Sequence, residues 1–157
     1  SYCSATTRGD AAPPRPKLSA LFDTVLLPVA LTHPESWEKA LPMAAKCASG
    51  GTLHLLAIVH DLGEAMVSSY LPEGFEKQAM ERAKAELSEF AAKHSADAEV
   101  HVGHGHVPET ILRVADQLEA DLIVMASHPP GGLSTLLVGS NADRVVAHAT
   151  RPVLVVR

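Results

Sequence analysis

The C-terminal stretch from Asp121 to Arg157 constrains the fold most, because it has the pattern of a strand, a loop, a helix and a second strand. An apolar run ends at Ala126, and a loop rich in proline and glycine follows from Ser127 to Thr135. The sequence Gly139-Ser140-Asn141 is then typical of a helix start, and a second apolar run covers Pro152 to Val156. Two such strands joined by a helix predict a parallel sheet that is buried on both faces.

The loop after Ala126 should lie at the carboxyl end of its strand. In an open parallel sheet this is where ligands bind, and the helix that starts near Gly139 would point its free backbone amides at the same place. The stretch therefore predicts a ligand-binding site between this loop and this helix.

The rest of the chain repeats the alternation of apolar strands and amphipathic helices. Strands are predicted over residues 23–30, 52–59 and 98–102, and helices over 34–49, 73–94 and 108–118. Pro42 predicts a kink in the first helix. The whole pattern predicts an α/β fold with an open five-stranded parallel sheet, right-handed crossovers and helices on both faces.

Composition supports one domain with an aliphatic core, since 46% of the 157 residues are hydrophobic and 4% are aromatic. We expect the domain to span residues 21–157. Residues 1–20 have few large apolar side chains and much proline, serine and threonine, which predicts a flexible leader or an artificial extension. The first residue is not methionine, which indicates processing or truncation.

Charge and hydropathy exclude several classes of partner. The net charge of -5 and the lack of any Lys/Arg cluster argue against nucleic acid and anionic membranes. No apolar run is long enough to span a membrane and no signal peptide opens the chain, so we expect a cytoplasmic protein. Cys3 and Cys47 form neither a disulfide framework nor a metal-ligand spacing.

The same C-terminal stretch resembles a known family. DLIVMA followed by SH-x-x-x-GL-x-x-LL-x-GS-x-A-x-RV-x-x-HA-x-x-PVLVV is similar to the C-terminal signature of the universal stress protein family. Gly105 to Ile111 resembles a turn of that family and Asp23 to Val29 its opening strand, so the resemblance covers residues 22–157. It implies an adenine-nucleotide alpha-hydrolase-like fold with strands in the order 3-2-1-4-5, and a homodimer.

The family's nucleotide-binding members resemble one another in a Gly-x-x-Gly, nine-residue gap, Gly-Ser/Thr pattern and in an Asp at the end of the first strand. At the positions of this pattern the chain has Ala126, Pro129, Gly139 and Ser140, and at the Asp position it has Ala30. The distal half of the motif is therefore kept, whereas the proximal half and the acid are not.

The two prolines of the loop weaken a phosphate site, because Pro129 and Pro130 have no backbone N–H to donate. Two lost hydrogen bonds to a charged group cost ~3 to 6 kcal/mol, which is roughly two to four decades of affinity. Gly131 and Gly132 could reshape the loop, and the helix start at Gly139 still offers amides. We therefore expect no tight ATP binding and no required cofactor, and the alternative is a weakened site for ATP or AMP, with or without Mg²⁺.

The candidate ligand-binding residues are Ala30, Ile58, Ala126, Ser127, His128, Pro129, Gly131, Gly132, Gly139, Ser140 and Asn141. The predicted function is that of a small regulatory or binding module without catalysis. A weak ATPase or phosphotransferase is the competing class, but no acidic pair for Mg²⁺ accompanies the Gly139 helix start, and no P-loop lysine or general base stands out. Ser127 and His128 are adjacent, and adjacent residues do not usually point at each other as a nucleophile and its base do.

A third class is a metal-storing or metal-sensing protein, because His101, His104 and His106 form a histidine-rich tract. No further ligand is evident near them in the sequence, and a solvated turn with incidental histidines is the preferred interpretation. The sequence therefore predicts no metal site.

The predicted last strand, Pro152 to Val156, carries no charge between Arg151 and Arg157. In the strand order that the family resemblance implies, this strand lies at an edge of the sheet, where an apolar strand is a template for pairing. We expect a homodimer through this strand, with Val153, Leu154 and Val155 in the contact.

Overall fold

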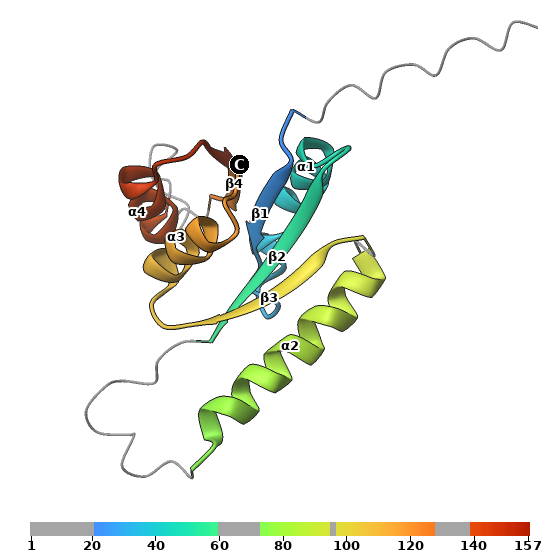
Figure 1. Cartoon of the computed structure of the whole chain (residues 1–157), viewed down its shortest axis with the longest axis vertical. Helices are drawn as coiled ribbons and strands as arrows, with labels where there is room; N and C mark the ends of the chain where they lie inside the picture. The colour runs from blue at the N-terminus through green and yellow to red at the C-terminus, as the bar shows by residue number, and fades with distance from the viewer. Residues whose placement is uncertain (1–20, 60–72, 95–96, 128–138) are drawn as a thin grey trace, which may run out of the picture.

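The computed structural model describes residues 21–59, 73–94, 97–127 and 139–157. Its sheet has five parallel strands in the order β3-β2-β1-β4-β5. Figure 1 labels β1 to β4 of this sheet. They are β1 (Thr24–Pro28), β2 (Thr52–Val59), β3 (Glu99–His104), β4 (Leu122–Ala126) and β5 (Val153–Val156). The predicted fold class and strand order are confirmed. The leader predicted over residues 1–20 lies outside the described residues.

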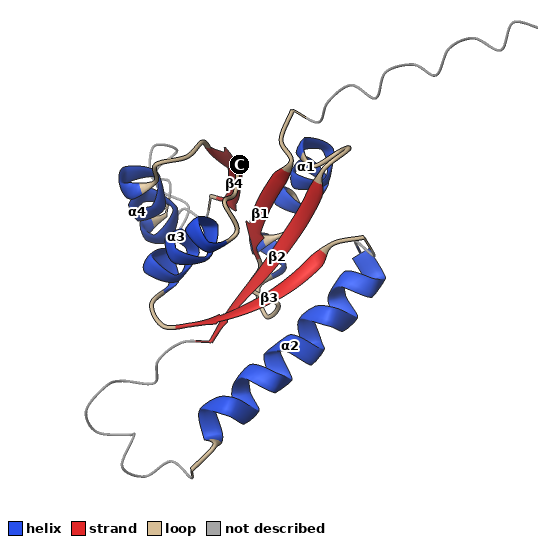
Figure 2. Cartoon of the chain, viewed as in Figure 1, coloured by secondary structure: helices blue, strands red, loops and turns tan. Residues whose placement is uncertain are grey.

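Helices cover both faces of the sheet (Figure 2). They are the short 3-10 helix η1 (Pro34–Ser36), α1 (Ala40–Cys47), α2 (Phe75–His94), α3 (Val107–Gln117) and α4 (Ser140–His148). Helices α1 and α2 pack on one face, and α3 and α4 pack on the other. In the described part of the chain, no helix combines the length and the apolar character that a membrane span requires.

Strand β1 shows how the sequence builds two cores. Val25 and Leu27 pack with α1 and α2, whereas Leu26 between them packs with α3 and α4, and all three are fully buried. Because successive side chains of a strand point to opposite faces, a central strand covered on both sides must be apolar throughout. This is why the strands have continuous apolar runs.

The segment after β1 differs from the prediction of one helix over residues 34–49. A 3-10 turn ends at Ser36, and the α-helix begins at Ala40, so Pro42 lies in the first helical turn. The first amides of a helix have no partner within it, so a proline in the first turn removes no hydrogen bond of the helix.

Strand β3 also runs further than predicted, to His104 instead of Val102. Gly103 permits this, because α3 packs directly on the strand at this point. A Cβ atom on Gly103 would lie 2.4 Å from Thr110 Cγ2, and Thr110 is itself buried. Gly103 is thus a close-approach site inside the strand.

Candidate functional site

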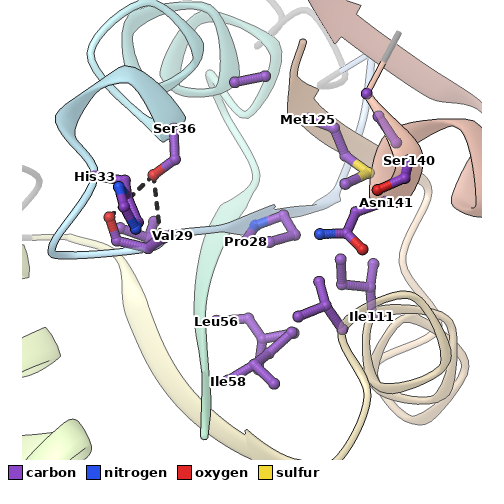
Figure 3. A pocket seen from close by; sticks show the side chains of 15 residues that line it. Pro28, Val29, His33, Ser36, Leu56, Ile58, Ile111, Met125, Ser140 and Asn141 are labelled. Carbon is purple, nitrogen blue, oxygen red and sulfur yellow. Dashed lines mark hydrogen bonds between the residues drawn. The ribbon is translucent and has the colours of Figure 1, made fainter. Parts of the chain in front are cut away.

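A cavity of about 500 Å³ opens at the carboxyl ends of β1, β2 and β4. It brings together, from the predicted set, Ala30, Ile58, Ala126, Gly139, Ser140 and Asn141 (Figure 3). Ser127 does not line it, and its N–H donates to the Val156 carbonyl at 2.8 Å. His128, Pro129, Gly131 and Gly132 lie outside the described residues. The volume is in the range of sites for small organic ligands.

The position of the cavity follows from the topology. The helix after β1 covers one face of the sheet and the helix after β4 covers the other, although β1 and β4 are neighbours. The chain therefore leaves the two strand ends in opposite directions and opens a crevice between them, which is the usual ligand site of an open α/β sheet.

The described wall of the cavity is largely apolar. Leu56, Ile58, Ile111 and Met125 contribute side chains to it, and Asn141 lies close to them in the close-up view (Figure 3). Among the described lining residues there is no Asp, Glu, Lys or Arg. This wall therefore favours an apolar group, and its described residues offer no carboxylate for a ribose or for Mg²⁺.

At the end of β1, Ser36 of η1 holds the backbone of Ala30 at both of its polar groups. The Ala30 N–H donates to the Ser36 hydroxyl at 3.1 Å, and the hydroxyl donates to the Ala30 carbonyl at 3.0 Å (Figure 3). The short 3-10 helix, which the sequence analysis did not separate from α1, thus fixes this edge of the cavity.

The other edge of the cavity is the start of α4. Its N-cap is Gly139, with φ 59° and ψ 144°, and no described side chain caps the helix. Gly139, Ser140 and Asn141 line the cavity, so the first amides of α4 lie at its edge, and the anion-binding role predicted for this helix start stays a prediction.

We expect Gly139→Ala to lower the free energy of unfolding by about 1 to 3 kcal/mol, because a Cβ atom disfavours the positive φ of this residue. Urea unfolding followed by circular dichroism measures the change. Ser140→Ala, one residue later and exposed, is the matched control and should stay within about 0.5 kcal/mol of the unaltered protein. Equal stabilities for Gly139→Ala and the control would contradict the assigned backbone conformation.

A second cluster of polar side chains lies at the pairing of β2 with β3. His54 Nδ1 is 2.8 Å from His101 Nε2 and 3.4 Å from Glu99 Oε2. His54 is buried, whereas 63% of the Glu99 side chain is exposed. Burial, with smaller contributions from His54 and Lys84, lowers the pKa of His101 below its ordinary value, although Glu99 opposes the shift.

The histidine tract of the sequence is divided in the structure. His101 contacts His54 of the neighbouring strand, His104 lies 3.8 Å from Glu76 of α2, and His106 is the exposed N-cap of α3. Sequence reasoning identified His101 but missed His54 and Glu99. His54 and Glu99 come together because the register of β2 on β3 makes them partners. The sequence of one strand does not determine its register on the next strand, so this contact could not be predicted.

Comparisons with known proteins agree with this geometry. The sequence profile of the Universal stress protein family matches residues 22–157. Universal stress protein G of Salmonella typhimurium is 32% identical over 143 residues, which cover 87% of this chain and 100% of that protein. The structure is similar to that of universal stress protein UspA from Lactobacillus plantarum, with a TM-score of 0.61, 26% identity, and coverage of 85% of this chain and 97% of the other.

A crystal structure of a universal stress protein in complex with cAMP also shares the fold, with a TM-score of 0.54 and 23% identity over 87% of this chain and 97% of that one. The structure has the strand order 3-2-1-4-5 and a cavity between the ends of β1 and β4. The family profile covers every helix and strand that the structure describes. The chain belongs to the universal stress protein family.

Proposed function

We propose that this chain is a small cytoplasmic regulatory or binding module that acts as a homodimer and binds ATP no more tightly than about the millimolar range. The observation that carries the proposal is that Ala30 lines the cavity. The family resemblance implies that nucleotide-binding members have an Asp at this position. The described wall lacks charged side chains, and the sequence places Pro129 and Pro130 where phosphate-binding amides are needed. Both features weaken recognition of a triphosphate.

The same features support a role without catalysis. Phosphoryl transfer needs a metal held by carboxylates or phosphates and a cation beside the transferred group. The described lining residues supply neither a carboxylate nor a Lys or Arg side chain. His33, which lines the cavity beside Ser36, is the one titratable side chain among them.

A weakened adenine-nucleotide site is the second candidate function, and two observations favour it. The cavity of about 500 Å³ is large enough for a nucleoside, and the start of α4 presents amides that no described side chain caps. AMP and cAMP carry less charge than ATP, so they depend less on the amides that the prolines remove.

Calorimetric titration of the unaltered chain with ATP, AMP and cAMP, each with and without Mg²⁺, tests the proposal. We expect no ATP binding tighter than about 1 mM, because a micromolar site that loses two to four decades of affinity becomes roughly a millimolar one or weaker. Micromolar binding of AMP or cAMP alone would favour the second candidate. A low-micromolar dissociation constant for ATP would refute the proposal.

The proposed dimer rests on β5, which is an edge strand of the sheet. All four of its residues are apolar and only half-buried. Soluble proteins rarely leave such an edge uncovered, and pairing around a two-fold axis covers it on both subunits with one contact.

A further inference from the structure

The cluster of His54, Glu99 and His101 lies apart from the nucleotide-type cavity, and none of the three residues lines that cavity. The cluster occupies the β2–β3 side of the sheet, where β3 is the edge strand opposite β5. His54 and Glu99 are register partners, and His101 follows Glu99 by two residues on the same face of β3. The backbone pairing therefore holds all three side chains on one side of the sheet.

Three atoms that can act as acceptors converge in this cluster. Nδ1 of His54, Nε2 of His101 and a Glu99 oxygen lie within 4.8 Å of one another. A single hydrogen between the two imidazoles satisfies the His54–His101 contact at 2.8 Å, but it leaves the Glu99 oxygen, 3.4 Å from the same Nδ1, without that donor. One cation bound by all three atoms would satisfy each of them.

From this geometry we infer that His54, Glu99 and His101 form a binding site for one zinc ion. Two imidazole nitrogens and one carboxylate oxygen are a common zinc ligand set with a fourth position left for water. In a tetrahedral site with bonds of ~2.0–2.2 Å, the ligand atoms are separated by about 3.3 to 3.5 Å. The Nδ1–Oε2 distance of 3.4 Å has this value, and the 2.8 Å contact needs the half-buried His101 ring to move by about half an ångström. The third pair, His101 and Glu99, lies within 4.8 Å, and the exposed Glu99 carboxylate can turn to bring it to the same separation.

The surroundings provide both rigidity and access. His54 is 7% exposed and comes from a strand with neighbours on both sides, so its ring is the fixed ligand. His101 also lines a groove of about 380 Å³, whose other lining residues come from α2, from β3 and from the C-terminal end of α3. The groove gives an ion from solvent a path to the cluster, and the exposed Glu99 carboxylate can complete the coordination.

Lys84 of α2 carries a positive charge, lines the same groove and interacts electrostatically with His101. A cation in the cluster would be repelled by this ammonium group. Lys84→Gln should therefore tighten zinc binding, a sign that a purely structural hydrogen bond between two histidines does not predict.

The test uses the full chain without a histidine tag, treated with a chelator and then titrated with zinc against a chromophoric competitor at pH 7.5. We expect one zinc ion per chain with a dissociation constant of about 10 µM or tighter, unaffected by 1 mM Mg²⁺, because nitrogen ligands select against Mg²⁺. Cobalt in place of zinc should give the intense visible absorption of a tetrahedral site.

His101→Gln and Glu99→Gln should each weaken zinc binding by at least about 10-fold, the lower end of the effect of changing even an outer partner of a metal ligand. Both residues are partly exposed, so these variants should fold even if a His54 variant does not. His106→Gln, at an exposed histidine on the N-cap of α3, is the matched control and should leave the affinity unchanged. Zinc binding weaker than about 100 µM, or binding that both ligand variants leave unaltered, would overturn the assignment.

Discussion

The variant Ala30→Asp with Pro129→Gly and Pro130→Arg is expected to bind ATP about two to four decades more tightly than the unaltered protein. Glycine and arginine restore the backbone N–H groups that the two prolines lack, and amides directed at a phosphate contribute ~1.5 to 3 kcal/mol each. Aspartate restores a carboxylate at the cavity edge. Ala30 lines the cavity and is exposed, so the larger side chain can be accommodated. Calorimetry with ATP and Mg²⁺ measures the gain.

The matched control carries the same two loop changes but places the new acid on α1, as Ala45→Asp. Ala45 is exposed and does not line the cavity, so the control has the same net charge without a carboxylate in the site. It should show the gain of about two to four decades that the loop amides supply, and any further gain in the Ala30→Asp variant measures the carboxylate. If neither variant gains affinity, the geometry of the loop, and not its missing donors, prevents nucleotide binding.

The variant Val155→Lys is expected to be a folded monomer at micromolar concentrations where the unaltered protein is a dimer. Val153 packs with the α3 and α4 core, and Leu154 and Val156 pack with the α1 and α2 core, whereas Val155 is half-buried and belongs to neither. Lysine at this position therefore spares both cores. Two lysines brought together across a two-fold axis would be buried without partners, at a cost of about 3 to 5 kcal/mol, or two to three decades in the dimer dissociation constant.

Light scattering over a concentration series measures the assembly, and circular dichroism reports whether the fold is kept. Phe75→Lys is the matched control, because Phe75 is 38% exposed on α2, a helix that packs on β2 and β3 at the far edge of the sheet. It should remain dimeric. A monomeric unaltered protein, or a Val155→Lys variant that is both folded and dimeric, would contradict the proposed interface.

The fold was predictable where a buried strand has a continuous apolar sequence. Strand β2 has the predicted bounds, Thr52–Val59, because the five consecutive residues 53–57 are all buried and favour a strand covered on both faces. The elements that differed depend on tertiary contacts. The strand at Gly103 continues because Thr110 approaches it, and the break before Ala40 follows from where Pro42 can be placed in a helix.

Some residues of the candidate site were also predictable from the sequence, and others were not. Ala30, Ile58 and Ala126 were predictable because parallel strands end at one edge, and the cavity joins them to the predicted α4 start. The bonds between Ser36 and Ala30 and the contact between His54 and His101 were not predictable, since both need positions that only the folded chain defines. Periodicity reports which face a residue occupies, but not which residue of another strand it meets.

The two hydrogen bonds between Ser36 and Ala30 fix the end of β1 whether or not a ligand is bound in the pocket. Both polar groups of the Ala30 backbone are satisfied within the protein, so the end of β1 needs no ligand atom to complete its bonding. Residues around the pocket can then change during evolution without loss of a folded scaffold. Members of one family can in this way keep the same architecture while their ligands diverge, because selection on stability and selection on binding act on different atoms.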